Sequence, residues 1–149
     1  KCGRRRAVTG GGGVLRRARP RGKRAICAGP GKPPVVVDET ADLELAGRGI
    51  VNGASFDNNI VCVDEKEVIA VSSIVDKLLD QMKRHGAYIV NERDFHKIER
   101  AIFSVVRGRR QREVVAKDLI GKKAAEILAR AGIAYSGDPT LLVVRVSNG

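Results

Sequence analysis

One residue whose type and setting suit chemistry is a cysteine in an irregular segment. Cys62 follows an Asp-Asn-Asn run in a stretch that separates a helical pattern from a strand pattern. Loops between rigid elements concentrate reactive groups, and a cysteine there is a nucleophile when its thiolate is stabilised. A cysteine with aliphatic neighbours, however, is more often a small buried hydrophobic residue. Local sequence therefore leaves both interpretations open.

Four consecutive glycines at residues 10–13 form a second candidate site. They follow a short strand end at residues 7–9, and glycine lets backbone N–H groups approach an anion closely. No Gly-Lys-Ser/Thr follows them, and Arg16 stands where the dinucleotide fingerprint has its third glycine. A phosphate-binding turn and a plain glycine loop both remain open.

The remaining residue types exclude several other site classes. Cys2, Cys27 and Cys62 have no Cys-x-x-Cys spacing, and neither His85 nor His96 has a second ligand nearby in sequence, so we expect no metal site. An odd number of cysteines fits a reducing cytosol better than secretion. The apolar runs are only a few residues long, so we expect no membrane span.

The basic charge is confined to one end of the chain. The formal net charge is +11, and residues 1–24 hold ten of the 28 basic side chains and no acidic one. The other residues carry 18 basic and 17 acidic side chains, as a soluble enzyme usually does. A nucleic-acid-binding module that uses the basic N-terminus is the alternative of another class. The lack of a reader motif and the five aromatic residues, all after residue 55, argue against it.

The elements that must position these residues follow an α/β pattern. From about residue 34, short β-branched runs alternate with helical periodicity. The expected strands are residues 35–37, which read as buried, and residues 67–71, 87–90 and 141–146. The predicted order is β-α-β-α-β-α-α-β, which suits a mixed or parallel sheet with flanking helices.

Four helices are expected between these strands. The first has apolar residues at helical spacing from Leu43 to Ala54. The second is expected to be capped by Ser72 or Ser73 and stopped by Gly86. The fourth covers residues 122–131 and follows an exposed connection at residues 107–112. The apolar stripe of the third helix is expected to be Phe95, Ile98, Ile102 and Val105.

Two longer motifs carry a resemblance to a known family. Residues 29–43 read GPGKPPVVVDETADL, and residues 53–67 read GASFDNNIVCVDEKE. Both resemble, without gaps, the active-site region of CoA-acylating aldehyde dehydrogenases. These are the acetaldehyde and propionaldehyde dehydrogenases of the microcompartment type, which are related to the aldehyde dehydrogenase half of bifunctional aldehyde-alcohol dehydrogenases. The similarity continues more loosely to Val146.

The resemblance implies a role for Cys62. In that family the cysteine after Phe-Asp-Asn is the nucleophile, and its thiolate attacks an aldehyde to give a thiohemiacetal. Hydride transfer to NAD then leaves a thioester, and coenzyme A releases it as acyl-CoA. The backbone N–H of Cys62 is expected to form half of an oxyanion hole. The asparagine that completes this hole in the wider superfamily is expected to lie upstream of the chain.

Residue 28 favours the acylating branch. Hydrolytic aldehyde dehydrogenases have a Glu-Leu-Gly-Gly-Lys motif whose glutamate activates water, and the matching stretch here begins with Ala28. A coenzyme A thiol ionises near pH 8.5, as cysteine does, and needs less help from a base than water does. The acyl acceptor is therefore expected to be a thiol.

The resemblance also implies an architecture and a cofactor site. Residues 34–149 are expected to be the central part of the catalytic domain, and residues 1–33 a remnant of the NAD-binding domain. Thr9, Gly10 and Gly11 match the family's Thr-Gly-Gly turn near the dinucleotide. On this resemblance the chain is expected to lack most of the cofactor-binding domain, which makes an inactive fragment a further alternative. The whole enzyme is expected to be a homo-oligomer in the cytoplasm or inside a bacterial microcompartment.

Overall fold

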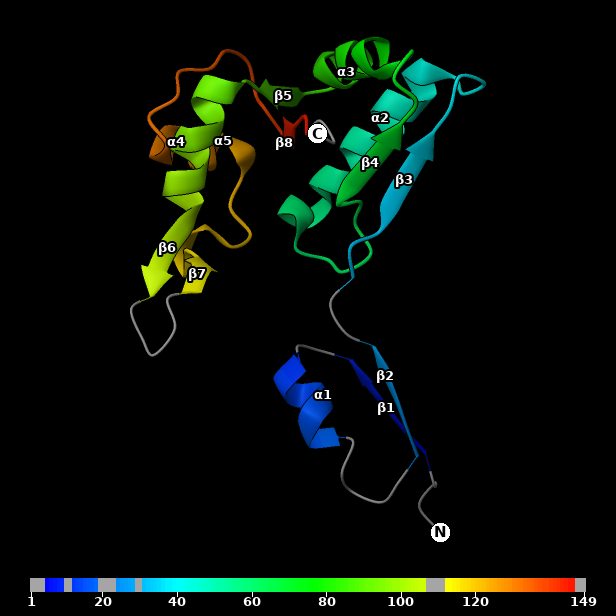
Figure 1. Ribbon diagram of the computed structural model, residues 1–149, viewed down its shortest axis with the longest axis vertical. Helices are drawn as coiled ribbons and strands as arrows, with labels where there is room; N and C mark the ends of the chain where they lie inside the picture. Colours follow the sequence, from blue (N-terminus) through cyan, green and yellow to red (C-terminus); the bar gives the residue numbers. More distant parts are fainter. Residues whose placement is uncertain (1–4, 10–11, 19–23, 29–30, 107–111, 147–149) are drawn as a thin grey trace. The chain divides into compact units, whose positions relative to one another are not determined.

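The structure is a computed structural model that describes residues 5–9, 12–18, 24–28, 31–106 and 112–146 (Figure 1). The chain forms two compact units, Lys1–Lys32 and Pro33–Gly149.

The first unit is a short β-α-β arrangement. Strand β1 (Arg5–Thr9), helix α1 (Gly12–Ala18) and strand β2 (Arg24–Ala28) follow one another. The two strands pair in parallel, with Arg5 opposite Arg24 and Thr9 opposite Ala28, and a helical crossover is the usual way to join such strands. The strand end expected at residues 7–9 is confirmed. The last two glycines of the run at residues 10–13 belong to α1, whereas Gly10 and Gly11 lie outside the described residues.

The second unit has the mixed α/β composition that the sequence predicts. Every predicted strand and helix is present, although several bounds differ. Its elements are β3 (Pro34–Val37), α2 (Leu43–Ser55), η1 (Phe56–Asn59), β4 (Glu67–Ala70), α3 (Val75–Arg84), β5 (Ala87–Val90), α4 (Glu92–Ile102), β6 (Phe103–Val106), β7 (Arg112–Val115), η2 (Lys117–Leu119), α5 (Ala124–Arg130) and β8 (Leu141–Val144).

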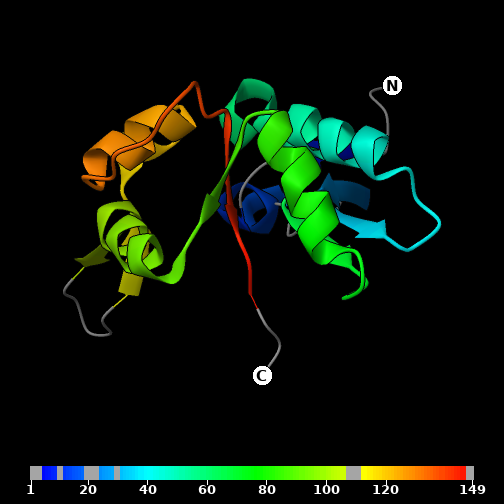
Figure 2. The same ribbon diagram turned by 90° about the horizontal axis from the view of Figure 1, so that it is seen from above.

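Strands β5 and β8 form the centre of this unit. They pair in parallel, and their residues alternate between two core clusters. Ala87 and Ile89 face the first core cluster, whereas Tyr88 and Val90 face the second, because successive strand residues point to opposite faces. Figure 2 shows α2 and α3 on one side of these strands and α4 and α5 on the other. Both faces of the pair are therefore covered, as is usual for parallel strands.

The first core cluster is formed by α2, α3 and the parallel pair β3–β4. Helix α2 starts at Asp42, whose carboxylate accepts hydrogen bonds from the N–H groups of Glu44 and Leu45, and it buries Ile50 and Val51. Helix α3 buries Leu78 and Met82. The buried residues of this cluster are Val37, Ile50, Val51, Ile74, Leu78, Met82 and Ala87.

Two expectations about this part of the unit are wrong. The run at residues 35–37 reads as buried, but Val36 is 74% exposed, because only one face of the β3–β4 pair packs on α2 and α3. Helix α3 was expected to be capped by Ser72 or Ser73, but its N-cap is Ile74, which makes no side-chain cap. Ile74 is itself buried, so apolar packing rather than a hydroxyl cap determines where the helix begins.

The predicted third helix is too long. Helix α4 ends at Ile102, and Val105 belongs to β6, which pairs antiparallel with β7. Alternation and helical spacing cannot be told apart in so short an apolar run, so the hairpin was missed. The exposed connection expected at residues 107–112 lies outside the described residues, apart from Arg112, which begins β7. Phe95 is 36% exposed instead of joining the inner stripe.

Asp94 takes an inward position on α4, where it is only 8% exposed. Its carboxylate accepts hydrogen bonds from Lys97 Nζ at 3.1 Å, Tyr88 Oη at 3.1 Å and Asn91 Nδ2 at 2.9 Å. The Asn91 side chain in turn accepts from the Asp94 N–H, which caps the helix. The hydrogen bond from Lys97 lowers the pKa of Asp94 the most, and those from Tyr88 and Asn91 lower it further. The pKa of Asp94 therefore lies below its usual value.

A pH-dependent stability follows from this network. Because the folded-state pKa of Asp94 is lowered, its carboxylate stabilises the fold above the usual pKa of about 3.9, and this contribution is lost as pH falls through the lowered value. Urea denaturation of the wild type should show stability falling between about pH 5 and pH 2. In Asp94→Asn the fall should be shallower, and an equal slope in both proteins would contradict the assignment.

Two glycines of α2 make a matched test of helix packing. A Cβ atom on Gly47 would lie 2.7 Å from Gln81 Cβ and 3.1 Å from the Met82 N atom, whereas a Cβ on Gly49 would meet nothing within 4 Å. Gly49→Ala should raise the free energy of unfolding by about 0.5–1 kcal/mol. Gly47→Ala should lower it by about 1 kcal/mol or more, because α2 and α3 must separate. Chemical denaturation measures both, and equal effects would contradict the close approach.

Candidate active site

Cys62 lies on an exposed turn that connects the end of α2 to the start of β4. Helix α2 ends at Ser55, η1 covers Phe56–Asn59, and β4 begins at Glu67. Residues 61–64 form bends and a turn, and the thiol of Cys62 is free and exposed. The nucleophile candidate is therefore reachable from solvent and is not a core residue.

The backbone before Cys62 is left-handed over three consecutive residues. The φ angles are 45° at Asp57, 54° at Asn58 and 62° at Asn59. Aspartate and asparagine tolerate this region better than most other residues with a side chain, yet it remains costly for them. Other contacts must therefore hold the segment in place.

The side chain of Asn59 provides such contacts. Its Nδ2 atom donates to the carbonyl of Ala54 at 2.6 Å and to the carbonyl of Glu65 at 3.0 Å. These carbonyls belong to the end of α2 and to the residues just before β4. One amide group therefore connects the two ends of the segment that carries Cys62.

Lys66 and Asp64 hold the peptide next to Cys62. Lys66 Nζ donates to the Asn59 carbonyl at 2.9 Å and to the Val61 carbonyl at 3.0 Å. Asp64 is 4% exposed, and its carboxylate accepts from the Val61 N–H at 3.0 Å. The Asp64 N–H donates back to the Val61 carbonyl at 3.2 Å. Within the part of the chain that the structure describes, the Cys62 N–H donates no hydrogen bond.

Three apolar side chains of the segment that carries Cys62 are exposed. Phe56, Ile60 and Val63 are 65%, 53% and 72% exposed. The Asn58 side chain donates to the Gly121 carbonyl at 3.0 Å, which connects the turn to the segment between η2 and α5. A Cβ atom on Gly121 would clash with the Ile60 side chain, so the two segments approach closely. An apolar surface beside a thiol suits a substrate with an alkyl group.

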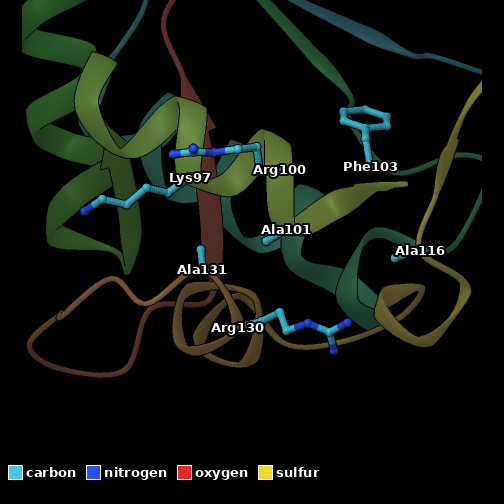
Figure 3. A pocket seen from close by; sticks show the side chains of 7 residues that line it. All are labelled: Lys97, Arg100, Ala101, Phe103, Ala116, Arg130 and Ala131. Carbon is cyan, nitrogen blue, oxygen red and sulfur yellow. The ribbon is translucent and has the colours of Figure 1, made fainter. Parts of the chain in front are cut away.

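A separate hollow of about 460 Å³ lies between α4, β6 and α5 and takes no residue from the Cys62 turn (Figure 3). It is lined by Lys97, Arg100, Ala101, Phe103, Ala116, Arg130 and Ala131. Its cations do not converge, because Lys97 and Arg100 extend to one side in Figure 3 and Arg130 to the other. Lys97 pairs with Asp94 and Arg130 with Asp118, so the hollow is not a strong anion site.

The predicted cofactor residues belong to the first unit, whereas Cys62 belongs to the second. Thr9 ends β1, and Ala28, the position without a carboxylate, ends β2. Gly10 and Gly11 lie outside the described residues. The described residues hold no group of three or more possible metal ligands. None of the described helices is long and apolar enough to cross a membrane.

The sequence alone did not predict the role of three residues that hold this turn: Asn59, Asp64 and Lys66. The Asp-Asn-Asn run was a usable signal for Asn59, because these residue types favour left-handed backbone. Asp64 and Lys66 gave no comparable signal, since charged residues after a loop usually indicate a solvated surface.

Known proteins with similar sequences include aldehyde dehydrogenases. The sequence profile described as the aldehyde dehydrogenase family matches residues 8–131. Acetaldehyde dehydrogenase (acetylating) EutE of Escherichia coli is 40% identical over 94% of this chain and 30% of its own length. Propanal dehydrogenase (CoA-propanoylating) of Salmonella typhimurium is 39% identical over 95% of this chain and 29% of its own. The chain thus spans about 30% of the length of these curated relatives.

Solved structures agree with the sequence relatives. Propionaldehyde dehydrogenase of Rhodopseudomonas palustris, with bound CoA and an acylated cysteine, has a TM-score of 0.81 and 36% identity, covering 95% of this chain and 32% of that one. An engineered glycolyl-CoA reductase with bound NADP+ has a TM-score of 0.83 and 37% identity over 96% and 32%. A propionaldehyde dehydrogenase from a Clostridium phytofermentans microcompartment has a TM-score of 0.82 and 35% identity over 94% and 31%. The expected fold class is confirmed.

Proposed function

Because the chain belongs to the aldehyde dehydrogenase family, we propose that it is part of a CoA-acylating aldehyde dehydrogenase whose nucleophile is Cys62. The observation that carries the proposal is the free, exposed thiol on a turn held by Asn59, Asp64 and Lys66. The acylating activities in the names of the two curated relatives support the reaction class.

The chemistry assigned to Cys62 proceeds in two stages. The thiolate adds to the aldehyde carbonyl carbon, so a carbon–sulfur bond forms and the oxygen takes the negative charge. The nicotinamide cofactor supplies the hydride acceptor, and loss of the hydride leaves the acyl group on Cys62 as a thioester. The CoA thiolate attacks the carbonyl carbon of this thioester, the bond from that carbon to the Cys62 sulfur breaks, and acyl-CoA forms as Cys62 leaves as a thiolate.

The Cys62 backbone N–H is proposed to stabilise the negative oxygen. It donates to no other described residue, so it is available to a substrate. The apolar side chains of Phe56, Ile60 and Val63 beside it suit the alkyl part of a small aldehyde.

Release by a thiol rather than by water follows from residue 28. Ala28 stands at the position where hydrolytic aldehyde dehydrogenases have a glutamate. The methyl side chain of alanine cannot remove a proton from water. The CoA bound in the R. palustris structure supports coenzyme A as the acceptor.

NAD is the proposed redox cofactor, and Thr9, Gly10 and Gly11 are proposed to contact it. The first unit supports this role because β1 and β2 are parallel with α1 between them, the arrangement that binds dinucleotides where a strand passes into a helix. The NADP+ bound to the engineered reductase supports a nicotinamide cofactor in general.

The whole enzyme is proposed to be a homo-oligomer in the cytoplasm or in a bacterial microcompartment. The microcompartment origin of the C. phytofermentans relative supports the second location.

Product analysis with and without coenzyme A tests the proposed reaction. In a full-length enzyme that carries residues 1–149, NADH should form continuously from an aldehyde only when coenzyme A is present. Without it, one turnover should leave an acyl group on Cys62 that mass spectrometry of the peptide detects, because no base activates water. Sustained release of free carboxylic acid without the thiol would contradict the acylating assignment.

A further inference from the structure

The peptide bond between Val61 and Cys62 is held from its carbonyl end only. The Val61 carbonyl accepts from Lys66 Nζ at 3.0 Å and from the Asp64 N–H at 3.2 Å, so both of its lone pairs are used. The other end of the same peptide unit is the Cys62 N–H, which has no partner among the described residues.

The geometry of a peptide unit connects these two ends. In a planar trans peptide the C=O and N–H bonds point in opposite directions, and no described peptide is cis. Anchoring the Val61 carbonyl against Lys66 therefore directs the Cys62 N–H away from Lys66. Hydrogen bonds to a carbonyl also polarise the rest of the amide, and a charged donor has a larger effect than a neutral one.

The surroundings of Lys66 favour this role over that of a surface lysine. Its side chain is only 21% exposed, and the ammonium group contacts two carbonyls within the turn. Its third proton has Asp64 as the nearest carboxylate, 4.0 Å away, which is too far for a tight ion pair. Asp64 is instead occupied by the Val61 N–H. The positive charge is thus directed mainly at the backbone beside Cys62.

We infer that Lys66 is a positioning residue that orients and polarises the Val61–Cys62 peptide, so that the Cys62 N–H becomes a stronger donor to an oxyanion formed on the thiol's substrate. The inference rests on the proposed function, because it assumes that Cys62 attacks a carbonyl. It adds that the positive charge of Lys66, which takes no part in the reaction itself, strengthens the Cys62 N–H as a donor through the Val61–Cys62 amide. Lys66 itself touches no reacting atom in this arrangement.

Two reagents that use the same thiol differently test the inference on the chain itself. p-Nitrophenyl acetate acylates a thiolate through a tetrahedral oxyanion and needs the N–H donor, whereas iodoacetamide alkylates it by direct displacement and does not. In Lys66→Met, acylation of Cys62 should fall about tenfold, less than the 100-fold or greater loss that follows removal of a whole donor. Alkylation should stay within about twofold of the wild-type rate.

Conservative and remote variants complete the design. Lys66→Arg keeps the charge and should recover most of the acylation rate. Lys77→Met makes the same substitution at an exposed position of α3 and should change neither rate. Thermal melts of each variant show that it is folded. The ¹⁵N chemical shift of the Cys62 amide provides a second measurement, and it should change in Lys66→Met and return toward its wild-type value in Lys66→Arg.

The outcomes separate this inference from the proposed function. Wild-type acylation in Lys66→Met overturns the inference alone, as does a parallel fall of both rates, which indicates a loosened turn. An unchanged amide shift in a folded Lys66→Met protein also overturns it. A wild-type Cys62 that neither reagent modifies overturns the proposed function together with the inference.

Discussion

Cys62→Ala is expected to reduce acyl-CoA formation by about 10,000-fold or more in a full-length enzyme that carries this chain. Without the thiol there is no covalent intermediate, and the two easier steps collapse into one difficult step. A loss of this size corresponds to about 5 kcal/mol of transition-state stabilisation. Steady-state NADH formation at saturating coenzyme A measures it.

Two further variants sharpen this result. Cys62→Ser should retain very little activity, because a hydroxyl without an adjacent base is a much weaker nucleophile than a thiolate. Cys27→Ala is the matched control, since it removes another thiol, in β2, and should keep activity within a few-fold of wild type. Loss in the control with retention in Cys62→Ala would move the nucleophile to a different residue.

Asn59→Ala is expected to lower the free energy of unfolding by about 2–4 kcal/mol. The substitution removes the two hydrogen bonds that Nδ2 donates to the Ala54 and Glu65 carbonyls, each worth about 1 kcal/mol. It also places alanine at a φ of 62°, which costs roughly 1 kcal/mol more than asparagine does there. Chemical denaturation at neutral pH measures the sum.

Asn59→Gly separates the two contributions. Glycine loses the same hydrogen bonds but adopts left-handed backbone without strain, so it should be about 1 kcal/mol more stable than Asn59→Ala. Asn52→Ala, at an exposed position of α2, is the control and should change stability by no more than about 0.5 kcal/mol. Equal stability of the alanine and glycine variants would show that the left-handed backbone carries no cost.

The order of elements could be predicted because it depends on local periodicity. The apolar residues between Leu43 and Ala54 recur at helical spacing and lie in α2, and Ala87–Val90 forms β5 as expected. Gly86 was expected to stop the second helix, and its φ is 101° just after α3. A helix period or a glycine stop is a property of a few neighbouring residues, so it can be read without knowing what packs nearby.

Burial could not be predicted in the same way. Val36 and Val37 are adjacent valines, yet the first is 74% exposed and the second 3% exposed. Which face of β3 is covered depends on the position of α2 and α3, and no local pattern contains that information. Asp94 shows the opposite case, because a carboxylate becomes tolerable inside only when Tyr88, Asn91 and Lys97 converge on it.

By itself the sequence determined which residue is proposed to do the chemistry and which family the chain resembles, since the Phe-Asp-Asn motif and Cys62 lie within a few residues of one another. Only the tertiary structure decided what holds that residue. Lys66 reaches the Val61 carbonyl, and Asn59 joins the end of α2 to the approach to β4, because three left-handed residues fold the chain back on itself. A backbone reversal has no repeating period, so the contacts that it creates become visible only when the fold is known.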